Sequence, residues 1–399
     1  MREKILLIGP IPTELGSNDS GGVAIVVWNL AKSLMRRNKN VSIAATGRYF
    51  KGYQKREGIE IYGIGISIRA LFVTIWNLLA NLPVFKRISI KQGIKLLYSI
   101  YFLSYIRKKV DYDIIHVHHV INEIPRAAKL LGIRTKIVAT IHSYHSIIME
   151  ESKQKIDQEK LMINAQMDCI DHLTHVSKSV RRQGRDLGIK WSCKDDVIYN
   201  GIELDKLKNI SRTKNENFIC FVGSLINRKG IFELINSFSL LDKSSLDLKI
   251  IGDGEFKKEV ENVKNSQIQY HGILRNKEVI DLIGKSRALV VPSKSESFGL
   301  VYLEALSVGT PVIGYAAVLK EFKEYLDLDN KLNDWLIEYD YKEHDCNELK
   351  EKIRTVIKVK DKTNYKHQKE VITNLVRNNL SWDVVSNEYV KLYKGLSSG

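Results

Sequence analysis

The chain has 399 residues, of which 44% are hydrophobic, and carries a formal charge of +16 at neutral pH. This length and composition predict a globular protein of two ordinary domains. The four cysteines lie far apart and form no CxxC pair, which indicates neither a zinc motif nor a disulfide framework and favours a reducing cytosol. The basic charge is typical of proteins that bind phosphorylated ligands, anionic membranes or nucleic acid.

The first half alternates short apolar runs with helical patterns. The run Lys4–Gly9 predicts a buried strand, and no signal-peptide pattern precedes it. A loop ending in Gly21-Gly22 follows, and its backbone could approach a phosphate or sugar closely. Apolar residues then recur at helical spacing up to about Arg37. Further strands are predicted at 41–45, 59–62, 114–118, 136–141, 172–176 and 197–199. This alternation predicts a parallel sheet with helices on both faces.

Residues 67–110 contain eight basic residues, no acidic residue and many large apolar side chains. No apolar run in this stretch reaches the roughly 18 residues that a transmembrane helix needs. Basic amphipathic helices with aromatic residues are typical of segments that lie in a membrane interface. The other interpretation is a pair of ordinary helices that cover a sheet, with Lys and Arg stems over their rims. We expect contact with an anionic membrane surface through this stretch.

Histidines lie at the ends of two predicted strands in the first half. His116, His118 and His119 accompany one strand, and His142 and His145 follow the next. Because no carboxylate or cysteine accompanies them at ligand spacing, we expect no metal site. His142 is the candidate functional residue, because its strand delivers it to the sheet edge, where it could hydrogen-bond a substrate hydroxyl. The alternative is a histidine satisfied by neighbouring backbone groups.

The second half starts the pattern again after a polar joint that begins at Tyr199. Strands are predicted at 218–222, 248–251, 268–270, 289–291, 311–313 and 335–337. The loop after the first of these contains Arg228 and Lys229, cations that could stabilise a departing diphosphate. A last helix is predicted from the N-cap Ser381. We therefore predict a first domain at 1–199, a second at 200–380 and a terminal helix at 381–399 that packs back toward the first.

The most informative stretch is 290–315, in which Glu296 and Glu304 flank Phe298-Gly299-Leu300. Here a loop after a predicted strand enters a helix. Ligands of open α/β sheets bind at this edge, and the amides of a helix N-terminus suit a phosphate. Carboxylates beside a phosphate act as acceptors for sugar hydroxyls, so the predicted ligand is a sugar nucleotide. The other interpretation is that acidic residues favour the positive end of the helix dipole.

Two common nucleotide motifs do not occur in the sequence. The chain has no GxGxxG, which disfavours a nicotinamide or flavin dehydrogenase, and no GxxxxGK[ST], which excludes a P-loop ATPase. Nor does it contain a helix-turn-helix, zinc-finger or RNA-binding sheet motif, so we expect no nucleic acid as partner.

Together these segments resemble the retaining GT-B glycosyltransferases of the family 4 type (glycosyl transferases group 1), over nearly the whole chain. The resemblance rests on the order and spacing of loose motifs. These are Gly21-Gly22, Asp113–His118, Thr140–His142, Val197–Ile202, Phe221–Leu225 with Lys229-Gly230, Ile251–Gly254, Pro292–Glu304 and Gly309–Val312. It implies an α/β fold of two Rossmann-like domains, with parallel sheets facing across a cleft.

The resemblance implies a role for each matching residue. Glu296 would face the donor-sugar hydroxyls, and Glu304 would hold the ribose. The amides of Phe298–Leu300 would contact the donor sugar and its diphosphate. Lys229 would bind the diphosphate, and His142 would lie near the donor sugar.

One position departs from the family pattern. Ser224 stands where family members commonly carry arginine, so Arg228 is the candidate substitute for the missing cation. Contacts to the nucleobase would come from backbone near Gly272 and Ile273, and the Gly21-Gly22 loop would also contact the donor.

The implied activity is transfer of a hexose with retention, without a metal or another cofactor. We expect a UDP-sugar as donor in preference to a GDP-sugar. The expected acceptor is a lipid-linked intermediate of a surface polysaccharide, of the O-antigen or capsule type. This implies a cytoplasmic protein, peripheral on the inner face of the plasma membrane. The alternatives are a sugar-nucleotide epimerase of the same fold, which needs no acceptor, and a basic nucleic-acid-binding protein.

Overall fold

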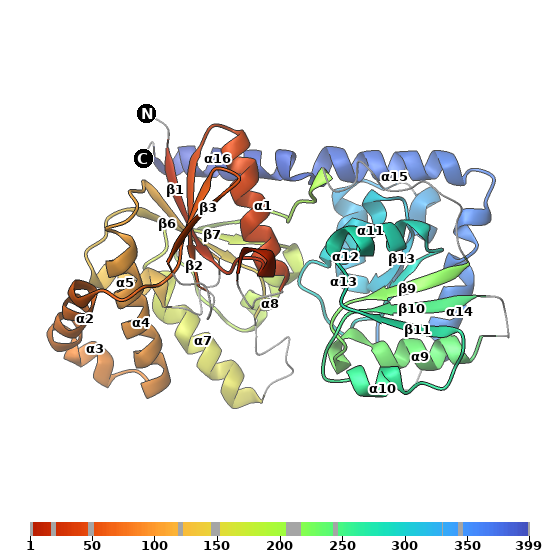
Figure 1. Cartoon of the computed structure of the whole chain (residues 1–399), viewed down its shortest axis with the longest axis horizontal. Helices are drawn as coiled ribbons and strands as arrows, with labels where there is room; N and C mark the ends of the chain where they lie inside the picture. The colour runs from red at the N-terminus through yellow and green to blue at the C-terminus, as the bar shows by residue number, and fades with distance from the viewer. Residues whose placement is uncertain are drawn as a thin grey trace. The chain divides into compact units, whose positions relative to one another are not determined.

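The computed structural model describes residues 3–16, 21–46, 52–118, 123–144, 152–204, 217–241, 246–328, 330–341 and 346–397. The backbone divides into two compact units (Figure 1). Unit 1 contains Met1–Asn200 and Val385–Gly399, and unit 2 contains Gly201–Val384. The chain therefore returns to unit 1 within its last helix.

Unit 1 is built on an eight-stranded sheet in the order β3-β4-β2-β1-β5-β6-β7-β8. Its strands are β1 (Lys4–Gly9), β2 (Asn40–Ala45), β3 (Tyr53–Arg56), β4 (Ile59–Tyr62), β5 (Ile114–His118), β6 (Lys136–Ile141), β7 (His172–His175) and β8 (Lys194–Val197). All neighbours pair in parallel except β3 and β4. The central strands are buried along almost their whole length, as expected for a parallel sheet covered on both faces.

Both edge strands of unit 1 differ from the sequence prediction. Strand β3 is not predicted, because its side chains are polar or exposed and show no apolar alternation. A tight turn at Glu57 and Gly58, with φ of 48° and 83°, joins it to β4 in an antiparallel hairpin. The strand predicted at 197–199 was placed wrongly, since β8 ends at Val197. Its Lys-Asp-Asp-Val sequence lacks the apolar run of a central strand.

The helices of unit 1 are α1 (Gly22–Arg36), α2 (Ile68–Ala80), α3 (Leu82–Lys86), α4 (Ile90–Ile106), α5 (Ile124–Leu130), α7 (Lys153–Met167), α8 (Lys178–Asp186) and, from Val385 on, α16 (Trp382–Ser397). Figure 1 shows α2, α3 and α4 grouped together within this unit. Among the helices that the structure describes, none combines the length and the apolar character needed to cross a bilayer.

Unit 2 contains a six-stranded sheet in the order β11-β10-β9-β12-β13-β14, with every neighbouring pair parallel. Its strands are β9 (Phe218–Val222), β10 (Asp247–Ile251), β11 (Ile268–Gly272), β12 (Leu289–Val291), β13 (Val312–Tyr315) and β14 (Leu336–Tyr339). All six strands predicted for this half are confirmed, with bounds that shift by two residues at most.

The helices of unit 2 are α9 (Ile231–Ser239), α10 (Lys257–Glu261), α11 (Asn276–Lys285), α12 (Leu300–Ser307), α13 (Ala316–Tyr325), α14 (Cys346–Val356) and α15 (Tyr365–Leu380). Figure 1 shows α9 and α10 on one side of the strands and α11 and α12 on the other. The sheet is therefore doubly wound, with its apolar strands covered on both faces.

Each sheet has a point at which the order of successive strands reverses. In unit 2 the chain adds β10 and β11 on one side of β9, and then β12 to β14 on the other. In unit 1 the reversal lies between β1 and β5. Ligands of open α/β sheets bind outside the carboxyl ends of the strands at such points. The loops after β9 and β12, and those after β1 and β5, are therefore the places to look for a site.

Candidate functional site

Two side chains of opposite charge meet at the reversal point of unit 2. Lys229 ends a short 3₁₀ turn after β9, and Glu296 lies in the loop after β12. The Lys229 ammonium donates a hydrogen bond to Oε1 of Glu296. Ser293 Oγ donates to the same oxygen over 2.7 Å. The structure thus brings two predicted site residues together, with Glu296 only 7% exposed.

The Glu296 carboxyl group is held in its ionised form although it is buried. Burial by itself would raise its pKa, but the charges of Lys229 and Arg228, with hydrogen bonds from Lys229 and Ser293, bring the pKa below its ordinary value. Arg228 Nη1 lies 3.9 Å from the second carboxylate oxygen and donates to the Ser295 carbonyl over 2.7 Å. A buried carboxylate kept ionised in this way can accept hydrogen bonds from hydroxyl groups.

Glycines let the loops after β9, β10 and β12 approach one another backbone to backbone. Gly230 has a φ of 68°, and a Cβ there would stand 2.2 Å from the Pro292 carbonyl oxygen. Gly252 has a φ of 141°, and a Cβ there would stand 1.9 Å from the Gly223 carbonyl oxygen. No side chain fits at either position. This close approach fixes the loop that carries Lys229 against the loop that carries Glu296.

Helix α12 begins directly after the Glu296 loop. Gly299 is its N-cap, in the left-handed conformation with φ of 71°. The first N–H groups of a helix have no partner within the helix and carry partial positive charge. The predicted amides of Phe298–Leu300 lie at this start, and the Phe298 ring packs against Phe322 with centroids 5.2 Å apart. The loop therefore supplies amide donors beside a paired carboxylate.

Glu304 lies on the second turn of α12. Its carboxylate accepts a hydrogen bond of 3.3 Å from the Asn276 side chain at the start of α11. The sequence pattern does not single out Asn276, because an asparagine at a helix start is ordinarily interpreted as a cap. Ser293 is also missed, since a serine after a strand carries no chemical signal of its own.

The remaining predicted donor residues of unit 2 lie in neighbouring loops. Ser224 is exposed in the loop after β9. Gly272 ends β11 with a φ of 64°, and its carbonyl accepts from the Gly252 amide over 2.9 Å. Ile273 follows and is 74% exposed. Their predicted contacts to diphosphate and nucleobase stay predictions.

In unit 1, His142 lies at the carboxyl edge of the sheet. It follows β6, and its Nε2 is 3.0 Å from Nδ1 of His118, which ends β5. A Cβ at Gly9, the last residue of β1, would stand 3.2 Å from the His118 Cβ. His142 is therefore linked through His118 to the reversal point of this sheet. The predicted His119 and His145 lie outside the described residues.

The Gly21-Gly22 pair lies at the start of α1, with Gly21 as its N-cap. The φ of Gly21 is −72°, a value that any residue adopts. Conformation therefore does not require a glycine there, and the predicted close approach of a ligand to this backbone stays a prediction.

His116 is part of a buried chain of hydrogen bonds. Its Nδ1 is 2.6 Å from the Tyr393 hydroxyl on α16, and its Nε2 is 2.6 Å from Thr140 Oγ1. Thr140 in turn contacts Thr174 Oγ1 over 2.6 Å. Burial, with a smaller effect of His142, lowers the pKa of His116 to about 3. This histidine is satisfied by its neighbours and ties three strands to the last helix.

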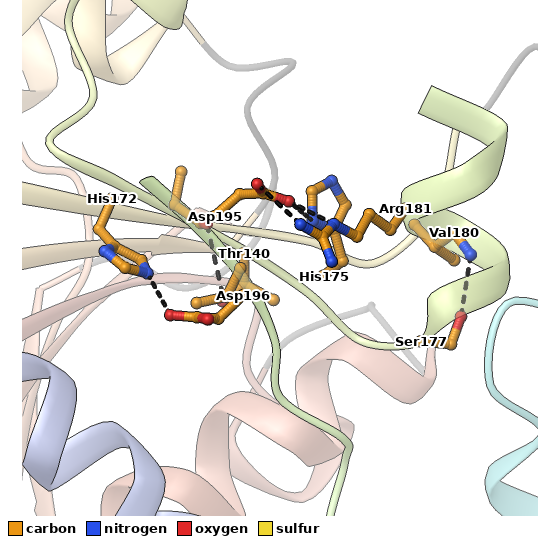
Figure 2. Close-up of polar contacts among 10 residues, drawn as sticks. Thr140, His172, His175, Ser177, Val180, Arg181, Asp195 and Asp196 are labelled. Carbon is orange, nitrogen blue, oxygen red and sulfur yellow. Dashed lines mark hydrogen bonds and ion pairs between the residues drawn. The ribbon is translucent and has the colours of Figure 1, made fainter. Parts of the chain in front are cut away.

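A second polar cluster joins α8 to the edge of the same sheet (Figure 2). Arg181 on α8 donates to Asp195 on β8 over 3.0 Å, and His175 Nδ1 at the end of β7 lies 3.8 Å from the Asp195 carboxylate. His172 Nε2 lies 2.9 Å from Asp196. Burial lowers the pKa of His175 to about 4, so its ring is neutral near pH 7. The Arg181–Asp195 contact of this cluster anchors α8 to β8.

Two other observations bear on the location of a site. A hollow of ≈240 Å³ is lined by residues that directly precede β5 and β6, which places it at the amino ends of the strands. That is the edge opposite to the one where α/β sheets bind ligands, so we assign it no role. Within the described ranges, no three His, Cys, Asp or Glu side chains stand close enough to share a metal ion.

Two protein families match consecutive parts of the chain. Residues 20–206 match the family described as Glycosyltransferase Family 4. Residues 204–378 match the family described as Glycosyl transferases group 1. The second match contains the whole Lys229–Glu296 site.

Two relatives illustrate the similarity of sequence. An uncharacterized glycosyltransferase of Methanocaldococcus jannaschii is 30% identical over 242 residues, which are 55% of this chain and 64% of the relative. An uncharacterized 41.2 kDa protein in the cps region of Klebsiella pneumoniae is 29% identical over 305 residues, 71% of this chain and 79% of the relative. The match thus spans less than two thirds of the first relative's length.

Solved structures share the fold over the whole chain. Sucrose-phosphate synthase from Thermosynechococcus elongatus has a TM-score of 0.73 at 17% identity, with all of both chains covered. HepE of Anabaena, solved in complex with UDP and glucose, has a TM-score of 0.67 at 14% identity, with 99% and 100% covered. At such identities the similarity shows the fold alone.

Proposed function

Because the chain belongs to the GT-B glycosyltransferases of the family 4 type, we propose that it transfers a hexose from a nucleotide-diphosphate sugar to an acceptor. The observation that carries this proposal is the Lys229–Glu296 pair at the reversal point of unit 2. The pair joins a cation and an ionised carboxylate beside the N-terminus of α12, which supports binding of a diphosphate together with sugar hydroxyl groups.

The proposed roles follow from the chemistry of each group. Glu296 accepts hydrogen bonds from the donor-sugar hydroxyls, and Glu304 accepts them from the ribose. Lys229 and the amides at Phe298–Leu300 stabilise the negative charge that grows on the diphosphate as the glycosidic bond to it breaks. Positive charge that is already in place there lowers the barrier without reorganisation.

Arg228 is the proposed second cation. Ser224, at the position where the family commonly has arginine, is an exposed neutral side chain. The Arg228 guanidinium is held within the same loop pair by the Ser295 carbonyl. With Lys229 it supplies two positive charges, so we propose that the reaction needs no metal ion.

The finer features of the proposal come from the family and its relatives. We propose retention of configuration by a front-face route, in which the departing phosphate oxygen takes the acceptor proton and no carboxylate acts as nucleophile. HepE was solved with UDP and glucose, which supports a UDP-sugar as donor. The relative in a cps region supports a surface-polysaccharide acceptor. We propose that this acceptor is lipid-linked and is used at the inner face of the plasma membrane, and that His142 lies near the donor sugar.

Ligand-dependent thermal unfolding tests the donor site without knowledge of the acceptor. A ligand that binds only the folded state raises the midpoint by mass action. We expect UDP and a UDP-hexose to raise it more than GDP or a GDP-hexose, and to do so in the presence of EDTA. Lys229→Ala removes a cation that binds the diphosphate and should abolish most of the shift.

The matched control is Lys258→Ala, which removes an exposed lysine of the same unit, on α10. It should leave the shift intact. The proposed site would be contradicted if nucleotides shifted the midpoint of the Lys229→Ala protein as much as that of the unmodified protein. It would also be contradicted if none of the nucleotides shifted the midpoint of the unmodified protein.

A further inference from the structure

Helix α2 has the reverse of the ordinary amphipathic pattern. The residues that it buries are Ala70 and Asn77. Its large apolar side chains are exposed instead: Leu71, Phe72, Ile75, Trp76 and Leu79. Residues at positions i, i+1, i+4, i+5 and i+8 share one side of a helix, so these side chains form a continuous apolar stripe. Phe72 and Trp76 are 67% and 71% exposed.

The stripe belongs to an anchored pair of helices. Helix α2 packs on α4, and Figure 1 shows the two close together. Tyr101 on α4 donates to the Gly65 carbonyl over 2.7 Å and accepts from the Ser67 amide over 2.8 Å. Ser67 in turn caps α2 by accepting from the Ala70 amide. The tertiary contacts therefore hold the apolar stripe outward, and Ile90 at the start of α4 is also exposed.

Positive charge lies at both ends of the α2–α4 pair. From 61 to 110 the sequence contains eight Lys and Arg residues and no Asp or Glu. Lys86, Arg87 and Lys91 are exposed around the turn between α2 and α4. At the other end of the pair, desolvation and, to a smaller extent, the nearby charges of Arg69 and Arg107 lower the pKa of Lys108.

We infer that α2, α3 and α4 form a docking surface for an anionic phospholipid bilayer. Apolar side chains at the acyl boundary, with Lys and Arg at the level of the headgroups, are the two components that interfacial helices combine. A second copy of the chain would bring two positive surfaces together, which is unfavourable. Nucleic acid would satisfy the cations but would leave the stripe without an apolar partner.

The inference rests on the proposed function for its purpose, since a bilayer is where a lipid-linked acceptor would reach unit 1. The physical claim is separate. Vesicle binding requires neither a bound donor nor sugar transfer. The protein could therefore bind nucleotide without binding vesicles, or bind vesicles without binding nucleotide, and the two proposals can fail separately.

Vesicle flotation tests the claim with the full chain. Phosphatidylcholine vesicles are compared with vesicles that also contain phosphatidylglycerol. We expect strong binding to the anionic vesicles, and a loss of roughly tenfold or more for the double variant Phe72→Ser with Trp76→Ser. Lys86→Glu with Arg87→Glu should cause a similar loss that mimics the effect of added salt.

Leu161→Ser is the matched control, because Leu161 is an exposed apolar residue of the same unit on α7. It should bind vesicles like the unmodified protein. Circular dichroism and the UDP-induced thermal shift should be unchanged in the Phe72/Trp76 variant, which separates loss of docking from loss of fold or donor site. The inference is overturned if that variant floats like the unmodified protein, or if anionic vesicles bind neither. The inference would also be overturned if the unmodified protein self-associated but did not bind vesicles, and the Phe72/Trp76 variant no longer self-associated.

Discussion

Lys229 has two tasks in the proposed mechanism. In the free protein it is the closest positive charge to the buried Glu296 carboxylate, and in the reaction it would stabilise a diphosphate. Arg228 at 3.9 Å and the Ser293 hydroxyl share the first task. Arg228 and Ser293 can therefore keep Glu296 ionised when a bound diphosphate pairs with the Lys229 ammonium.

A double-mutant cycle tests this pairing through stability. Lys229→Met removes one hydrogen-bond donor of Glu296 but leaves Arg228 and Ser293 beside it, and should lower the free energy of unfolding by about 1–3 kcal/mol. Glu296→Gln alone should cost less, because it leaves no uncompensated buried carboxylate. Chemical denaturation near neutral pH should give a double variant that is more stable than the sum of the single effects predicts. Strict additivity, or an equal loss in the exposed control Lys258→Met, would contradict the pairing.

At the scale of single residues, the sequence nominates candidate site residues but does not predict their contacts with one another. Lys229 and Glu296 are found from their places after strands, yet they are assigned to different parts of a ligand. Their direct contact joins residues 67 positions apart. It depends on β9 and β12 being neighbours in the sheet, which local sequence does not encode. Asn276, which donates to Glu304, is missed because an asparagine at a helix start is ordinarily interpreted as a cap.

Among the elements, central strands are predicted well and edge strands poorly. The bounds of β5, β6, β9 and β12 follow from continuous apolar runs, because both faces of these strands are buried. Strands β3 and β8 have one free edge and polar side chains, so their sequences carry no such signal. The amphipathic character of α2 is visible in the sequence, but which side faces the protein depends on its packing against α4.

Acid should weaken the junction of α8 with β7 and β8 through His175. Its folded-state pKa of about 4 lies below the ordinary value of 6.5, so the folded protein holds the neutral ring. The stabilisation is complete above pH 6.5 and is lost as the pH falls toward 4, because the unfolded chain then binds the proton first. The loss for this residue amounts to about 1.4 kcal/mol per pH unit within that window.

Unfolding midpoints measured between about pH 4 and pH 6.5 test whether stability falls as the pH is lowered. His175→Gln should make the decline toward acid shallower, whatever its effect on stability near neutral pH. His367→Gln, an exposed histidine on α15, should keep the full slope. Identical slopes for the two variants would show that His175 does not titrate as described. Part of the slope should remain in the His175→Gln protein, since the pKa of His116 is also lowered, to about 3.

For the whole molecule, the two proposals belong to different units. The Lys229–Glu296 pair of the proposed donor site lies in loops of unit 2, whereas the basic apolar surface of α2–α4 belongs to unit 1. If both proposals hold, the charge of +16 serves two separate anionic ligands, a diphosphate and a phospholipid bilayer. The two-unit α/β organisation is predictable from sequence because each half repeats its own alternation of strands and helices. The identity of the acceptor is not predictable from sequence, because contacts that a ligand makes with backbone or loop atoms leave no sequence motif.

The most direct test of the central claim follows a labelled hexose. A panel of UDP-hexoses, labelled in the sugar, is incubated with the protein and with lipid-linked glycans extracted from membranes. We predict that label enters the lipid fraction only when acceptor is present, with one UDP released for each sugar transferred. Glu296→Gln should lower this transfer by about 100-fold while the fold is kept. Conversion of the UDP-hexose without any acceptor, which an epimerase would cause, or full transfer by Glu296→Gln, would contradict the account.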